Sequence, residues 1–211
     1  MIYNQFYATH GHSYDEYEKS HKQRLDFLVE DLKLTELEDK KIVDIGCGLG
    51  FIWNRLPSTI QNNYYGYDGC NIEHPPFVYT QVDLDNFSTG LDNFFDVAMC
   101  FETLEHLTNP YSCLLETKKI LKINESILYL SIPEEHTTHN TIYPGLIYPK
   151  SNFEIFLQQM AFEIIDYRLH TKCFSQHVYT LINKDWSWSK MLWHKTEDKF
   201  RNIPPHVAIN L

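Results

Sequence analysis

The sequence is poor in positive charge. It carries 18 Lys and Arg residues against 28 Asp and Glu residues, so its formal net charge at neutral pH is -10. The longest basic stretches are the pairs Lys40-Lys41 and Lys118-Lys119. A nucleic-acid-binding protein ordinarily presents a basic face, because neutralising phosphates supplies most of its affinity. We therefore expect no nucleic-acid partner, although a small phosphorylated substrate is compatible with a locally basic pocket.

Cysteine and long apolar runs are also scarce. The 5 cysteines are odd in number and no pair has CxxC spacing, which is typical of reduced thiols in a cytosolic protein. No apolar stretch approaches the roughly 18 residues that cross a bilayer. Met1 is not followed by the charged and then apolar segments of a signal peptide. We expect a cytoplasmic protein that does not contact a membrane.

Histidine is plentiful, but it lacks the spacing of a metal site. The sequence has 11 histidines, and His10-x-His12 and His136-x-x-His139 are the only close pairs. Neither pair matches the H-E-x-x-H or Cys/His patterns that bind zinc. The sequence therefore predicts no bound metal.

The chain is long enough for one well-packed domain. Hydrophobic residues make up 43% of its 211 positions. Strand-like and helix-like segments alternate, which predicts an α/β fold with βαβ units around a mostly parallel sheet. We expect a single domain (1–211) made of an N-terminal helix or lid (1–33), a core (40–182) and a tail packed on that core (183–211). The expected strands are 41–45, 64–67, 77–82, 94–100, 127–132, 163–169 and 177–182, and the expected helices are 14–32, 51–56, 109–121 and one starting near 151.

A glycine-rich turn, Gly46-Cys47-Gly48-Leu49-Gly50, directly follows the first expected strand. Glycine permits a tight turn and lets a ligand approach the backbone, because no Cβ is in the way. The dinucleotide fingerprint G-x-G-x-x-G would place its third glycine at position 51, which is Phe51. The spacing therefore argues against a nicotinamide dinucleotide and favours another ligand that carries adenosine.

Acidic residues follow the next two strands. Asp68 ends the second strand, where a carboxylate can accept hydrogen bonds from both ribose hydroxyls of an adenosine. Asp83 ends the third strand and is placed to meet the adenine amino group, while Leu84 could pack against the ring. A lone Asp at such a point is often a helix N-cap. The adenosine hypothesis therefore depends on all three strand ends together.

With these features the chain resembles the class I S-adenosylmethionine-dependent methyltransferases. The resemblance covers about residues 40 to 182, and the order and spacing of its motifs agree. The matching positions are Asp44-Ile45-Gly46-Cys47-Gly48-Leu49-Gly50, Asp68, Asp83, and the fourth-strand segment from Phe95 to Leu107 with its Glu102-x-x-Glu105-His106-Leu107 pattern, followed by Asn109-Pro110.

The resemblance implies S-adenosylmethionine as the cofactor. It also implies a doubly wound, seven-stranded, mostly parallel sheet of order 3-2-1-4-5-7-6, with the last strand antiparallel and helices on both faces. Gly46 and Gly48 would lie under the methionine part of the cofactor, while Asp44 is either structural or a contact of its amino group. The expected cofactor contacts are Tyr14, Asp44, Gly46, Cys47, Gly48, Asp68, Gly69, Asp83, Leu84, Phe101 and Glu102.

Candidates for the acceptor side of the site are less tightly defined. Methyl transfer is an in-line substitution, and removing a proton helps when the acceptor is a hydroxyl. His106 is the first candidate base, because the reference pKa of histidine lies near neutrality; alternatively it only stabilises its loop. His136 is the second, in the long loop from Glu134 to Tyr148, where His139 and Tyr143 are candidate acceptor contacts.

The N-terminal arm from Tyr7 to Tyr14 is a further candidate. It could fold over the cofactor as a lid, with the ring of Tyr14 near the cationic sulfonium and His10 near the acceptor. The alternative is an aromatic arm that packs on the core or on a partner subunit.

We therefore expect an S-adenosylmethionine-dependent methyltransferase that acts on a small molecule, more readily on oxygen than on nitrogen. A surface-glycan precursor or a secondary metabolite would fit as the acceptor. The alternatives are N-methylation, methylation of protein side chains, aminopropyl transfer, and a non-catalytic module that only binds the cofactor. A monomer and a homodimer are equally compatible with the sequence.

Overall fold

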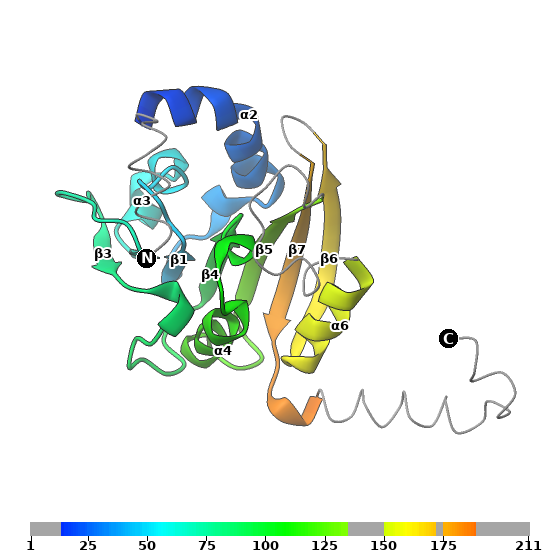
Figure 1. Ribbon diagram of the computed structural model, residues 1–211. Coiled ribbons are helices and arrows are strands. Elements are labelled where there is room, and N and C mark those ends of the chain that lie inside the picture. The colour runs from blue at the N-terminus through cyan, green and yellow to red at the C-terminus, as the bar shows by residue number, and fades with distance from the viewer. Residues whose placement is uncertain (1–13, 135–149, 172–174, 189–211) are drawn as a thin grey trace, which may run out of the picture.

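A seven-stranded sheet of order β3-β2-β1-β4-β5-β7-β6 forms the centre of the molecule (Figure 1). The computed structural model describes residues 14–134, 150–171 and 175–188. Neighbouring strands are parallel except β7, which runs antiparallel to both β5 and β6. The predicted strand order and the antiparallel strand are confirmed. The strands are β1 (Ile42–Ile45), β2 (Tyr64–Asp68), β3 (Val78–Gln81), β4 (Val97–Phe101), β5 (Ile127–Pro133), β6 (Phe162–His170) and β7 (Gln176–Asn183).

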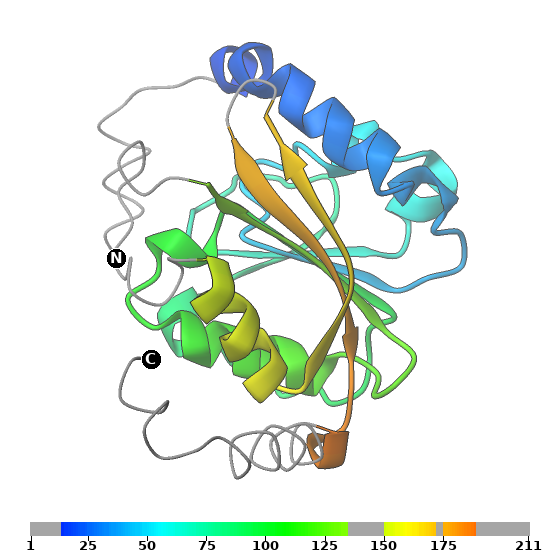
Figure 2. The ribbon, with the colours of Figure 1, turned by 90° about the vertical axis from the view of Figure 1, so that its right-hand side faces the viewer.

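Helices cover both faces of this sheet. Figure 2 shows α2 on one face, and α4 and α6 side by side on the other. The helices are α2 (Tyr14–Asp31), α3 (Ser58–Gln61), α4 (Pro110–Ile120) and α6 (Lys150–Gln159), and the 3₁₀ turns are η1 (Leu34–Glu36), η2 (Trp53–Arg55), η3 (Leu84–Asn86) and η4 (Leu104–His106). Within the described ranges, no helix has the length and apolar character needed to cross a membrane.

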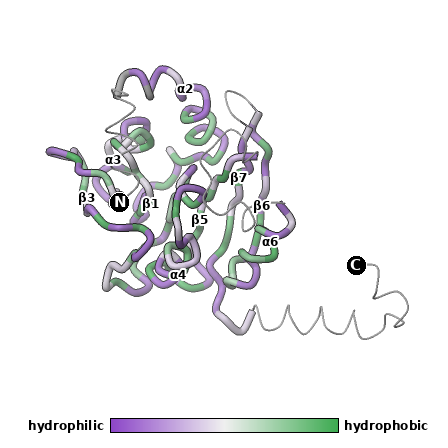
Figure 3. The backbone as a smooth tube through the Cα atoms, in the orientation of Figure 1, coloured by the Kyte–Doolittle hydropathy of each residue, from purple (hydrophilic) through white to green (hydrophobic). Residues whose placement is uncertain are grey.

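The long N-terminal helix α2 packs through one face only. Leu25, Leu28, Val29 and Leu32 are buried against the sheet, at the three- and four-residue spacing that places side chains on one helical face. Figure 3 accordingly shows hydrophilic residues along much of α2. The buried face of α2 thus covers the sheet on the side of β1 and β4.

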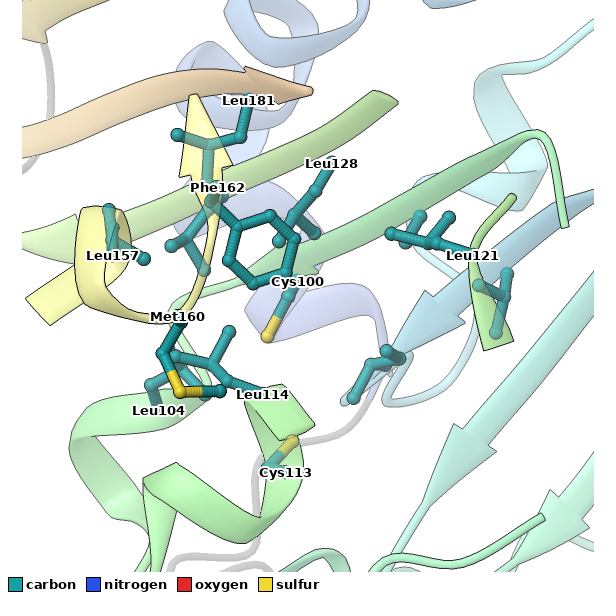
Figure 4. Close-up of a cluster of buried hydrophobic side chains, with 14 of the residues drawn as sticks. Cys100, Leu104, Cys113, Leu114, Leu121, Leu128, Leu157, Met160, Phe162 and Leu181 are labelled. Atoms are coloured by element: carbon teal, nitrogen blue, oxygen red, sulfur yellow. The ribbon is translucent and has the colours of Figure 1, made fainter. Parts of the chain in front are cut away.

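The opposite face of the sheet packs against α4 and α6. Side chains from β4, η4, α4 and β6 meet there, as Figure 4 shows for Cys100, Leu104, Leu114 and Phe162. All four are at most 1% exposed. The four cysteines in the described part of the chain are free thiols, in agreement with the reduced state predicted from the sequence. Cys173 lies outside the described residues.

One expected helix is wrong. The segment 51–56 was predicted to be helical, but it holds only the turn η2, and the short helix α3 starts after Pro57. The residue before a proline is pushed towards an extended backbone, and Leu56 has a ψ of 147°. Pro57 then serves as the N-cap residue of α3, and its carbonyl accepts the amide of Gln61 at 3.1 Å. The other expected elements are present, with ends shifted by a few residues.

Candidate active site

In the turn after β1, glycine is needed at positions 46 and 48 for different reasons. Gly46 has a φ of +77°, and a Cβ at this position would lie 2.1 Å from Oγ1 of Thr103. Gly48 has a φ of +51°, and a Cβ there would meet only the ring of Phe51 at 3.6 Å. Gly46 is therefore required by the protein's own packing, whereas Gly48 is the position that leaves the backbone open to a ligand.

Asp68 is held rigidly at the end of β2. Its side chain is buried, and its two carboxylate oxygens accept the backbone amides of Gly48 and Cys70, each at 2.8 Å. A carboxylate has about four lone-pair positions, so each oxygen keeps capacity for a further donor. The contact with Gly48 fixes the carboxylate directly beside the glycine turn.

Asp44 occupies the middle of the buried strand β1. The hydroxyl of Tyr64 donates a hydrogen bond to its carboxyl group. Burial raises the pKa of Asp44 to about 7, the negative charge of Asp68 adds to this, and the Tyr64 hydrogen bond acts in the opposite direction. The carboxyl group therefore exchanges its proton near neutral pH, which is an unusual property for a structural aspartate.

A pocket of about 460 Å³ opens at the carboxyl ends of β1, β2 and β4. This is the edge of a parallel sheet where ligands ordinarily bind. All the predicted cofactor contacts whose side chains are described lie in its wall. The lining residues are Arg24, Leu25, Leu28, Asp44, Gly46, Cys47, Gly48, Phe51, Ile52, Asp68, Gly69, Gln81, Val82, Asp83, Leu84, Asp85, Phe101, Glu102, Thr103, His106, Leu107 and Thr108.

Asp83 caps a helical turn and also lines the pocket, so its capping role is compatible with the predicted adenine contact. It is the N-cap of η3, where its carboxylate accepts the amide of Asp85 at 3.1 Å and the side-chain amide of Asn86 at 2.8 Å. It also lines the pocket together with Leu84. The capping bonds fix the carboxylate at the mouth of the pocket, so the structural role does not remove it from the site.

Arg24 is a further residue of the pocket, and it was not among the residues predicted from the sequence. This side chain comes from α2, is 4% exposed, and lines the pocket. Its guanidinium lies 3.5 Å from Oε2 of Glu102, which is also buried. Arg24 stands four residues before Leu28 and so shares its buried helical face. That spacing was the available signal, because a basic residue on an apolar face needs a buried partner.

His106 lines the pocket from η4, as predicted. Its Nε2 lies 3.7 Å from Oε1 of Glu105. Glu105 is fully buried, and within the described part of the chain neither of its carboxyl oxygens has a hydrogen-bond partner. Burial, and next the charge of Glu102, raise the pKa of Glu105 well above its usual range, while Arg24 acts in the opposite direction. Burial thus favours the protonated form of the carboxyl group that lies beside the candidate base.

Several candidates lie outside the described residues: His10, His136, His139 and Tyr143. Tyr14 begins α2, but its side chain is outside the described part. Their proposed contacts stay predictions. Among the described residues, no group of three or more His, Cys, Asp or Glu side chains could hold a metal ion, and the predicted lack of a metal likewise stays a prediction.

Most of the chain matches the profile of one protein family. The profile of a family described as "Methyltransferase domain" matches residues 14–187. The chain belongs to this methyltransferase family. S-adenosylmethionine is the family's cofactor, so the cofactor prediction and the class I resemblance are confirmed.

Curated relatives of this methyltransferase match only part of their length. A ubiquinone biosynthesis O-methyltransferase of Glaesserella parasuis is 27% identical over 148 residues, which cover 60% of this chain and 62% of the relative. The enzyme of the same name from Pasteurella multocida is 27% identical over 120 residues, covering 46% and 48%. The chain thus spans about half to three fifths of the length of these relatives.

Solved structures share the fold of this methyltransferase. A SAM-dependent methyltransferase from Aquifex aeolicus has a TM-score of 0.56 at 18% identity, covering 78% of this chain and 97% of that one. The cyclase SpnF has a TM-score of 0.57 at 15% identity, covering 77% and 80%. Because both identities are low, these likenesses establish the fold and leave the chemistry to the residues of the pocket.

Proposed function

We propose that this methyltransferase transfers the methyl group of S-adenosylmethionine to a hydroxyl oxygen of a small molecule. The observation that carries the proposal is the arrangement of Asp68 and Gly48 at the pocket, where a buried carboxylate is locked beside an open glycine backbone. This pairing suits a ligand that carries both a ribose diol and a chain that runs along the glycine turn.

The charges of the pocket match the groups of S-adenosylmethionine. In the proposal Asp68 accepts the ribose hydroxyls, and Asp83 and Leu84 contact the adenine. Asp44 faces the ammonium group. Arg24 is the only lining residue with a permanent positive charge among those that the structure describes, so it is the natural partner of the methionine carboxylate.

The acceptor is expected on the side of the pocket that carries His106. Leu25, Leu28 and Leu107 also line the pocket, and apolar walls with few polar groups are typical of small-molecule sites. When bound, S-adenosylmethionine would supply the methyl group to the acceptor oxygen, and S-adenosylhomocysteine would be the leaving group. The hydroxyl proton passes to Nε2 of His106, which acts as the general base.

The chemical class of the acceptor follows from charge and from the relatives. The net charge of -10 disfavours polyanionic partners, including nucleic acids. The curated relatives are named as O-methyltransferases, which supports oxygen over nitrogen. A surface-glycan precursor or a secondary metabolite is the proposed acceptor, and the protein is proposed to act in the cytoplasm, alone or as a homodimer.

A second candidate function is chemistry other than methyl transfer in the same pocket. The cyclase SpnF has this fold, which supports this alternative. Both functions require the adenosine pocket, so they are separated by the fate of the methyl group and not by cofactor binding.

The test follows both the cofactor and the methyl group. Isothermal titration with S-adenosylhomocysteine should show stoichiometric binding, which Asp68→Asn should weaken and which the control Asp92→Asn, at an exposed aspartate, should not. Incubation with methyl-labelled S-adenosylmethionine and panels of small phenols, sugars and amines should then label hydroxyl compounds. Lack of binding would refute the proposal, and labelling of amines alone would refute its oxygen specificity.

A further inference from the structure

Glu102 is held in an unusual backbone conformation at the pocket. It directly follows β4, and its φ is +49°, in the left-handed region that non-glycine residues rarely adopt. Its side chain is buried. Strained residues of this kind persist only where their surroundings hold them in place, and they cluster at functional sites.

Ser131 is the residue that holds Glu102. It lies in β5 opposite Phe101 in the parallel ladder, and it is fully buried. Its hydroxyl donates to Oε1 of Glu102 at 3.0 Å and accepts the amide of Glu102 at 3.1 Å. The carbonyl of Ser131 also accepts that amide, at 3.2 Å. One hydroxyl thus binds both the backbone and the carboxylate of the same residue.

The two oxygens of the Glu102 carboxylate have different partners. Oε1 is engaged by Ser131, and Oε2 faces the guanidinium of Arg24 at 3.5 Å. A buried guanidinium needs a charged partner to compensate for its lost hydration, and its planar fork binds carboxylates only when it is correctly oriented. Glu102 therefore contributes to the orientation of Arg24 in the pocket, and Ser131 contributes to that of Glu102.

We propose that Ser131 is a positioning residue for the cofactor, acting through Glu102 and Arg24 on the methionine carboxylate. This inference rests on the proposed function. Ser131 does not itself line the pocket; it fixes the rotamer of Glu102, which in turn keeps the guanidinium of Arg24 aimed at the carboxylate. Pre-organisation of this kind saves the free energy of ordering the side chain when the cofactor binds.

The experiment compares two ligands that share an adenosine and a thioether sulfur. S-adenosylhomocysteine carries the amino-acid end of the chain, with its carboxylate and ammonium groups, and 5′-methylthioadenosine lacks that end. Ser131→Ala should weaken binding of S-adenosylhomocysteine about tenfold, which is typical of losing a hydrogen bond to a charged group. It should leave the dissociation constant of 5′-methylthioadenosine within about twofold. Glu102→Gln should give the same ligand-specific loss, because it removes the charge that faces Arg24.

Two further variants control for folding. Ser131→Thr keeps the hydroxyl and should restore most of the affinity for S-adenosylhomocysteine. Ser126→Ala removes another fully buried hydroxyl, just before the other end of β5, where it donates to the carbonyl of Lys122. That variant should leave both ligands unaffected, so it separates a general loss of stability from a loss of positioning.

The outcomes distinguish the inference from the function on which it rests. If the wild type binds neither ligand, the proposed function fails. If Ser131→Ala weakens both ligands equally, or leaves S-adenosylhomocysteine unchanged or bound more tightly, the function stands and the positioning role of Ser131 is refuted.

Discussion

The buried carboxyl group of Asp44 should make the stability of the free protein depend on pH. Its pKa is raised from the model-compound value of 3.8 to about 7, chiefly by burial. Replacing it with Asn keeps the shape, and the hydroxyl of Tyr64, which now donates to the carboxyl group, can donate to the amide oxygen. Asp44→Asn therefore removes the ionisation while preserving the hydrogen bond.

The direction and size of the effect follow from the two pKa values. Between about pH 4 and pH 7 the carboxyl group is ionised in the unfolded chain and protonated in the folded one. The folded state then binds more protons, so its stability falls as the pH rises through this range. Each pKa unit is worth about 1.4 kcal/mol. A shift from 3.8 to about 7 therefore costs the wild type about 4 kcal/mol at pH 7 and above.

Urea unfolding of the wild type and of Asp44→Asn at pH 5, 6, 7 and 8 measures this contribution of Asp44 to the free energy of unfolding. The free energy of unfolding of the variant, relative to that of the wild type, should increase by about 1.4 kcal/mol per pH unit up to pH 7. Above pH 7 this difference should stay constant. Asp92→Asn, at an exposed side chain, should run parallel to the wild type. A difference between wild type and Asp44→Asn that stays flat with pH would refute the reasoning.

Cofactor binding should lower the pKa of Asp44, so that its carboxyl group loses its proton. If Asp44 faces the ammonium group, it is ionised in the complex, so binding below pH 7 must release a proton. The affinity for S-adenosylhomocysteine should then rise by up to about tenfold per unit between pH 5.5 and 6.5. Titrations in buffers of different ionisation enthalpy count that proton directly, and a count of zero would contradict the contact.

Three other substitutions test separate parts of the structure. Gly46→Ala should abolish cofactor binding in titration calorimetry, because its Cβ would overlap Thr103 and its φ is +77°; retained affinity would show that the turn can shift. His106→Gln should lower kcat about 100-fold or more with an unchanged KM for S-adenosylmethionine, and unaltered turnover would remove it as the base. Asn183→Ala should lower the free energy of unfolding by about 2–4 kcal/mol, since it removes the side-chain acceptor of Lys118, at 2.6 Å, and the side-chain donor to the carbonyl of Leu121, at 3.0 Å. A loss below about 0.5 kcal/mol in urea unfolding would mean that other groups replace these hydrogen bonds.

The class of fold and the identity of the cofactor could be predicted from the sequence alone. The glycine turn and Asp68 could be recognised because each stands at the end of a strand, and parallel strands bring those ends to one edge. The relation is local: a strand, a turn and a side chain within a few positions suffice. The glycine missing at Phe51 excluded the dinucleotide interpretation on the same local basis.

Only the three-dimensional structure shows which contacts fix those residues and which other residues line the pocket. Arg24 reaches the pocket only because α2 lies across the sheet, and Ser131 contacts Glu102 only because β5 lies beside β4. Such contacts join residues far apart in the chain. The helical spacing of Arg24 and Leu28 indicates a buried side chain, but it does not indicate which residue that side chain contacts. The reason why Gly46 must be glycine was likewise invisible, since it is Thr103 that fills the space.

The ionisation of the site also belongs to the tertiary structure. Asp44 and Asp68 are the same residue type in the neighbouring strands β1 and β2, yet Asp68 accepts two backbone amides while Asp44 accepts the hydroxyl of Tyr64. Burial and neighbouring charge set the pKa of Asp44 near 7. Neither the burial nor the neighbouring charge can be predicted from the sequence around Asp44. The glycine turn and its acids predicted the cofactor, and the three-dimensional packing around them sets the ionisation of Asp44 and brings Arg24 to the pocket.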